Sequence, residues 1–64
     1  MYVNGEEKTL DRDTPLIEFL TQAGYDPQRI AVEKNGSIVP RGSYGSEILC
    51  NSDKIEIVCF VGGG

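Results

Sequence analysis

The chain has no histidine, only two cysteines and only six basic residues among its 64 residues, and each shortage excludes a class of function. Histidine is the commonest general acid or base. The sequence also lacks a Gly-x-Ser-x-Gly turn, a phosphate-binding glycine loop before a helix and a cluster of metal ligands. Intrinsic catalysis and a metal site are therefore not expected. The basic residues are scattered and the net charge is −4, which argues against nucleic acid and fits a partner with a basic docking surface.

The cysteines and the short apolar runs bear on the compartment. Cys50 and Cys59 are too few and too far apart for a zinc site or a Cys-x-x-Cys redox pair. We expect free thiols, with Cys59 as a small core residue of the last strand. No apolar run approaches the roughly 20 residues of a membrane span, and Met1-Tyr2-Val3 reads as a strand, not a secretion leader. The sequence thus predicts a cytoplasmic protein that does not bind a membrane.

Two Asn-Gly pairs predict two tight hairpins, because both central residues of such a turn need a positive φ. Asn4-Gly5 follows the first strand, Tyr2-Val3, and Asn35-Gly36 separates Ile30–Lys34 from Ser37–Pro40. Proline cannot donate to a strand ladder, so the last of these segments is expected at an edge or end of the sheet.

One helix is predicted over about residues 14–23. Thr14 is the expected N-cap and Pro15 the first helical residue. Apolar residues then recur at helical spacing and form one stripe, with Ile17 at its border: Leu16, Phe19, Leu20 and Ala23. Gly24 is expected just past the helix end, in a Schellman motif.

The final strand, residues 55–61, is apolar on both faces and is expected in the middle of a sheet. Ile55 and Ile57 are predicted to face the helix, with Val58 and Phe60 on the open face. Residues 46–50 fit either a short strand or a single helical turn. The element order places the final strand beside the first strand, with the helix as a right-handed crossover between them. It therefore predicts an α+β fold of the β-grasp type, with one helix across one face of a mixed four- or five-stranded sheet.

The chain then runs into Gly62-Gly63-Gly64, which we expect to be a mobile tail after a single domain of residues 1–61. One interpretation is a frayed end without a function. The other makes the carboxylate of Gly64 the reactive group, because a tail without side chains can enter a narrow channel. A carboxylate becomes reactive once AMP is attached, and a sulfur nucleophile can then convert it to a thiocarboxylate. On that interpretation the protein is a group carrier and a substrate of other enzymes.

The sequence resembles the ThiS family of sulfur carriers in thiamine biosynthesis, a branch of the ubiquitin-like β-grasp proteins. The resemblance spans essentially the whole chain. It rests on Val3-Asn4-Gly5, Ala31-Val32, Asn35-Gly36, Ile38–Arg41, Asp53–Val58 and the terminal glycines. The Gly-Gly end carries the functional weight of this resemblance.

The resemblance implies specific partners and roles. The Gly64 carboxylate would be adenylated by a ubiquitin-activating-like enzyme of the ThiF type, which uses ATP, while the carrier itself binds no cofactor. A persulfide from a donor such as a cysteine desulfurase would supply the sulfur. Thiazole synthase of the ThiG type would then consume the sulfur. Gly62 and Gly63 would thread the tail into these enzymes, and Val58 and Phe60 would dock them.

Two alternatives stay open at this point. The same mechanism could serve molybdopterin synthesis, tRNA thiolation or another sulfur-transfer pathway, although the molybdopterin carrier is usually longer. A ubiquitin-like binding module with an inert tail is the alternative of a different class. That module would tolerate extension or removal of Gly64.

Overall fold

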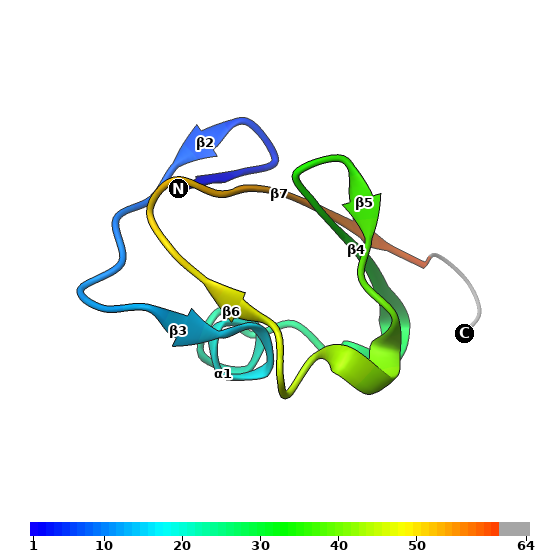
Figure 1. Cartoon of the computed structure of the whole chain (residues 1–64). Coiled ribbons are helices and arrows are strands. Elements are labelled where there is room, and N and C mark those ends of the chain that lie inside the picture. Colours follow the sequence, from blue (N-terminus) through cyan, green and yellow to red (C-terminus); the bar gives the residue numbers. More distant parts are fainter. Residues whose placement is uncertain (61–64) are drawn as a thin grey trace.

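A five-stranded mixed sheet with one helix on one side forms the fold (Figure 1). The computed structural model describes residues 1–60. The strands of the sheet are β1 (Tyr2–Val3), β2 (Glu6–Glu7), β4 (Ile30–Lys34), β5 (Ser37–Ile38) and β7 (Lys54–Cys59), in the spatial order β2-β1-β7-β4-β5. The last strand is therefore central, parallel to β1 and antiparallel to β4, which confirms the prediction.

Both Asn-Gly turns form as predicted. The φ angles are +53° at Asn4, +84° at Gly5, +52° at Asn35 and +87° at Gly36. Positive φ at both central residues matches the right-handed twist of the flanking strands. Each turn leaves a two-residue loop, so the register of both edge strands is fixed by the turns.

Helix α1 (Leu16–Gln22) begins one residue after Pro15, the first helical residue that the sequence predicts. Thr14 and Pro15 instead form β3, and Pro15 occupies the N-cap position without a side-chain cap. The Thr14 hydroxyl donates to the carbonyl of Arg12 at 2.8 Å. The prediction of Thr14 as N-cap is therefore wrong.

Backbone carbonyls from a distant segment take the place of that cap. The N–H of Leu16 donates to the carbonyl of Glu47 at 2.8 Å, and the N–H of Ile17 donates to that of Tyr44 at 2.9 Å. These bonds satisfy donors that a helix start otherwise leaves without partners. The start of α1 is thus fixed by tertiary contacts.

The end of α1 is the predicted Schellman motif. The N–H of Tyr25 donates to the carbonyl of Leu20 at 2.9 Å, and that of Gly24 to Thr21 at 3.2 Å. Gly24 has a φ of +87°, the left-handed conformation that this motif requires. The short 3₁₀ helix η1 (Pro27–Arg29) then leads into β4.

Residues 46–50 contain a short strand, β6 (Ile48–Leu49), which settles the choice that the sequence left open. It pairs antiparallel with β3 (Thr14–Pro15) in a separate two-stranded sheet. The 3₁₀ helix η2 (Arg41–Ser43) lies on the path from β5 to β6. Figure 1 shows this small sheet beside α1, on the same side of the main sheet.

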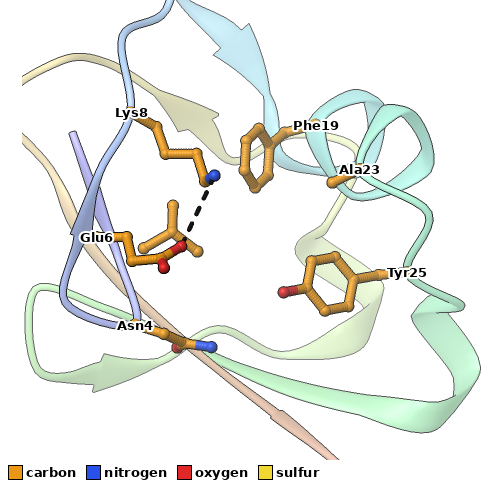
Figure 2. Close-up of a pocket in the computed structure, with 7 residues that line it drawn as sticks. Asn4, Glu6, Lys8, Phe19, Ala23 and Tyr25 are labelled. Atoms are coloured by element: carbon orange, nitrogen blue, oxygen red, sulfur yellow. Dashed lines mark ion pairs between the residues drawn. The ribbon is translucent and has the colours of Figure 1, made fainter.

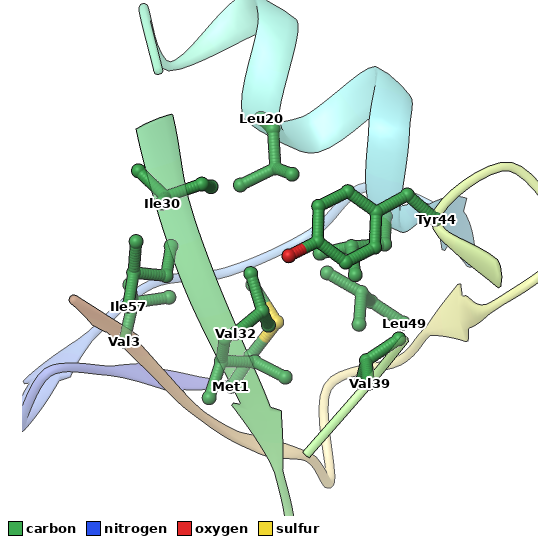
Figure 3. Close-up of a cluster of buried hydrophobic side chains, with 11 residues drawn as sticks. Met1, Val3, Leu20, Ile30, Val32, Val39, Tyr44, Leu49 and Ile57 are labelled. Carbon is green, nitrogen blue, oxygen red and sulfur yellow. The ribbon is translucent and has the colours of Figure 1, made fainter. Parts of the chain in front are cut away.

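The core lies between the main sheet and the layer formed by α1 and β6. Figure 3 shows buried side chains from these elements converging on one cluster. Its members are Met1, Val3, Leu16, Leu20, Ile30, Val32, Val39, Tyr44, Leu49, Ile55 and Ile57. Of the predicted helix stripe, Leu16 and Leu20 are fully buried, Phe19 is half-buried and Ala23 is exposed.

Candidate functional site

The two faces of β7 carry different side chains. Ile55 and Ile57 are buried against the helix layer, whereas Val58 and Phe60 are 59% and 58% exposed. This distribution confirms the predicted alternation. Near the end of the described chain, Val58 and Phe60 therefore present apolar side chains to solvent, two residues before Gly62 at the nearest.

Strand β4 holds this end of β7 in place. The register pairs Ile30 with Cys59 and Ala31 with Val58. The N–H of Phe60 donates to the carbonyl of Arg29 at 2.8 Å, one residue beyond the ladder. The backbone is thus hydrogen-bonded as far as the last residue that the structure describes.

The open face is the side of the main sheet away from α1. The strand register places residues of all five strands on it, and Phe60 continues the alternation of β7. They are Tyr2, Glu7, Ala31, Glu33, Ile38, Lys54, Glu56, Val58 and Phe60. Tyr2 and Ile38 are 49% and 73% exposed, so the apolar surface extends beyond the two residues that the sequence singled out. The sequence signal for these two was the alternation within their own strands, which becomes informative only with the register.

The side chain of Asn4 continues the pairing of β7 where β1 ends. Its amide oxygen accepts from the N–H of Ile57 at 2.7 Å, and its amide nitrogen donates to the carbonyl of Ile57 at 3.2 Å. The Asn4 N–H donates to the carbonyl of Ile55 at 2.9 Å. The residue that makes the first turn thus also fixes β7 just before Val58.

Asn35 has the same double role at the start of β7. Its N–H donates to the carbonyl of Lys54 at 2.8 Å, and its side-chain oxygen accepts from the N–H of Lys54 at 2.9 Å. Its amide nitrogen donates to the carboxylate of Asp53 at 2.9 Å. Sequence reasoning identified both asparagines as turn residues and missed their contacts with β7.

Buried Asp53 and half-buried Lys34 form a charge pair at the start of β7. The Lys34 ammonium lies 2.7 Å from the Glu47 carboxylate and 3.7 Å from that of Asp53. Burial by itself would raise the pKa of Asp53, but hydrogen bonds from Asn35 and from the Cys50 N–H, with the charge of Lys34, lower it. The hydrogen bond to Glu47 is the main cause that raises the pKa of Lys34, against desolvation. This network joins the turn before β7 to the segment before β6.

The cysteine predictions have a mixed outcome. Cys50 and Cys59 are both free, as expected. Cys59, however, is exposed, so its expected place in the core is wrong. By the strand register it lies on the helix side of β7, two residues beyond Ile57 and opposite Ile30.

A hollow of about 330 Å³ opens between α1 and the first hairpin (Figure 2). Phe19 and Tyr25 form one wall, and Glu6 and Lys8 form the other, with 3.9 Å between their charged atoms. Val3 shares the helix side of the sheet with Ile55, so the hollow is on the opposite side from Val58. It is not part of the predicted docking site.

The remaining predictions concern metal binding, membranes and the glycine tail, and the structure describes residues 1–60. Residues 1–60 contain no group of three or more histidine, cysteine or acidic residues that could hold a metal. Among the helices of this part, none is long and apolar enough to cross a membrane. Gly62, Gly63 and Gly64 lie outside the described residues, as does the predicted boundary after residue 61. Docking by Val58 and Phe60 stays a prediction.

Comparison with known proteins identifies the family. The family model described as the ThiS family matches residues 1–64. The chain belongs to the ThiS family. This ThiS-family chain is 38% identical over 66 residues to the sulfur carrier protein ThiS of Bacillus subtilis, covering 100% of the chain and 98% of that protein.

A solved relative supports the fold assignment. The crystal structure of the thiamine biosynthesis protein ThiS from Geobacter metallireducens matches this ThiS-family chain with a TM-score of 0.82 and 27% identity. The match covers 98% of this chain and 96% of that one. The fold is therefore the ubiquitin-like β-grasp that the resemblance implied.

Longer proteins contain a segment similar to this ThiS-family chain. It is 41% identical over 64 residues to a thiazole synthase of Magnetococcus marinus, and 39% identical to that of Paramagnetospirillum magneticum. The match covers all of the chain, which spans only 20% of the length of each of these two relatives.

Proposed function

We propose that this chain is a sulfur carrier for the synthesis of the thiamine thiazole, acting as a substrate of other enzymes and not as an enzyme. The observation that carries the proposal is the ThiS-family match over residues 1–64, which includes the terminal glycines. The names of similar proteins, a sulfur carrier ThiS and thiazole synthases, favour the thiazole pathway over other sulfur-transfer routes.

The proposed chemistry takes place at the carboxyl group of Gly64. A carboxylate oxygen attacks the α-phosphorus of ATP on a ThiF-type enzyme, forming an acyl-adenylate and releasing pyrophosphate. The outer sulfur of a persulfide, supplied by a donor such as a cysteine desulfurase, attacks the carbonyl carbon and displaces AMP. A second thiol then attacks the donor-side sulfur of the acyl disulfide, which forms a disulfide between this thiol and the donor, with loss of the thiol proton, and releases the thiocarboxylate. The carrier needs no bound cofactor, because ATP is held by its partner.

Different parts of the chain contribute to this proposal. Gly62 and Gly63 have no side chains, so they fit a channel too narrow for other residues. Val58 and Phe60 are the proposed docking residues for the ThiF-type enzyme and for a ThiG-type thiazole synthase, which consumes the sulfur. Their exposure and the hydrogen bonds that hold β7 support this role. ATP and reduced thiols are plentiful in the cytoplasm, which is where we propose that the carrier works.

Intact mass spectrometry tests the proposal directly. The protein is incubated with ATP, a ThiF-type enzyme and a persulfide donor, with a sample lacking ATP as control. We expect a mass gain equal to sulfur replacing oxygen, located at Gly64 by fragmentation. A protein with a free Gly64 carboxylate that gains no sulfur would favour the alternative of a binding module.

A further inference from the structure

Two carboxylates lie opposite each other on the open face. Glu33 of β4 is paired with Glu56 of β7 in the antiparallel ladder. Side chains directly opposite in such a ladder have Cβ atoms about 4.5–5.5 Å apart, and like charges in these positions are destabilising. The sheet therefore carries an electrostatic repulsion between its two longest strands.

No ion pair within the described chain neutralises either carboxylate. Among residues 1–60, neither Glu33 nor Glu56 has a lysine or arginine within ion-pair distance. Lys54 is the one basic residue that the strand register of this part places on the open face. Glu7 adds a further acidic residue to that face. The face is thus apolar with excess negative charge.

The carboxylate pair lies among exposed apolar side chains. Ile38 is opposite Glu33 on β5, and Val58 follows Glu56 at the next position on the same face of β7. A partner that covers Val58 would also cover the carboxylates and remove water from them. Buried carboxylates need a cationic partner, because desolvation of an unpaired charge is strongly unfavourable. The charge of this face therefore specifies the chemistry of its partner.

We propose that Glu33 and Glu56 together bind one arginine side chain of the thiazole synthase that docks on the open face. This inference rests on the proposed function for the identity of the partner. A planar guanidinium presents several N–H donors in a fixed geometry and can bridge two carboxylates. A second copy of this chain does not fit, because face-to-face contact would bring the two acidic pairs together. Two proteins named thiazole synthase contain a segment similar to this chain, which supports this choice of partner.

Stability measurements provide the first test, and they need no partner. Glu33→Gln/Glu56→Gln removes the repulsion and keeps the shape of both side chains. We expect a melting temperature equal to or higher than that of the unmodified protein. Glu6→Gln/Asp11→Asn is the matched control, since it makes the same charge change away from the open face. A lower melting temperature for the Glu33/Glu56 variant alone would assign the pair a stabilising role and overturn the inference.

Binding to the ThiG-type thiazole synthase encoded in the same genome provides the second test. We expect Glu33→Gln/Glu56→Gln to weaken binding at least about tenfold, the loss of one charge-assisted contact, and the control variant to change it little. Added salt should weaken the unmodified complex more than the variant complex, since screening lengths fall from about 10 Å at 0.1 M to about 3 Å at 1 M. Equal affinity and equal salt dependence of the two would overturn the inference.

The outcomes separate this inference from the proposed function. If sulfur loads at Gly64 and the unmodified protein binds the synthase independently of Glu33 and Glu56, only the arginine site is wrong. If the unmodified protein does not bind the synthase, the inference fails whatever the loading result. If binding depends on both residues but no sulfur is loaded, the docking site stands and the carrier chemistry is wrong.

Discussion

At the scale of single residues, Asn4 combines two requirements that can be separated by mutation. A glycine at position 4 would adopt the φ of +53° without strain but could not make the two side-chain hydrogen bonds to Ile57. An alanine there would be strained at this φ and would also lose both bonds. We expect Asn4→Gly to lower the free energy of unfolding by about 1–3 kcal/mol. Asn4→Ala should lose about 1 kcal/mol more. Urea unfolding midpoints measure both, and an Asn4→Gly variant as stable as the unmodified protein would show that the side-chain bonds contribute nothing.

Asp53 gives the protein a specific dependence on acid. Its pKa is lowered in the folded state, so its ionised form stabilises the fold above the unfolded value of about 3.9. That contribution is lost as the pH falls from there through the folded pKa. Asp53→Asn should be less stable at neutral pH and should lose less stability on acidification. Melting temperatures over this pH range measure the difference, and parallel curves for the two proteins would contradict the prediction.

At the scale of elements, features encoded by neighbouring residues were predictable and those set by distant contacts were not. The Asn-Gly turns and the Gly24 helix end depend on local φ values and were correct. The start of α1 depends on the carbonyl of Glu47, which no pattern around Thr14 reveals. Propensity favoured a threonine cap there, and pairing with β6 prevailed.

Helix α1 is short, so its stability depends on packing more than on propensity. Leu20 is fully buried in the core. We expect Leu20→Ala to destabilise the protein by about 2–5 kcal/mol, through lost apolar contact and a cavity. Gln22→Ala is the control, because Gln22 is an exposed residue of the same helix and should stay near the unmodified value. Chemical unfolding measures both, and equal midpoints for the two variants would show that the buried face has been misassigned.

At the scale of the whole molecule, the sequence predicted the central strand but only part of the surface around it. The alternation along β7 was enough to place Val58 and Phe60 on the open face. The opposition of Glu33 and Glu56 follows from the register between two strands that are distant in sequence. The second turn sets the register between β4 and β5 but not this one. The β4–β7 register depends on the apolar pattern of both strands and on the bonds between Asn35 and Lys54, which the sequence does not reveal.

An extension after Gly64 should affect sulfur loading at the terminal carboxylate without affecting the stability of the folded domain. One alanine added after Gly64 moves the carboxylate by up to about 3.5 Å and adds a Cβ where the proposed channel accepts glycine. We expect sulfur loading, measured by intact mass, to be abolished. The melting temperature should stay unchanged, because the added residue follows Gly64 and lies outside residues 1–60, which contain the core and the sheet. A cleavable extension that leaves Gly64 after removal is the matched control and should load fully once cut. Loading of the alanine variant at the rate of the unmodified protein would contradict the requirement for a glycine carboxylate. A lowered melting temperature would show that the C-terminal residues contribute to the stability of the fold.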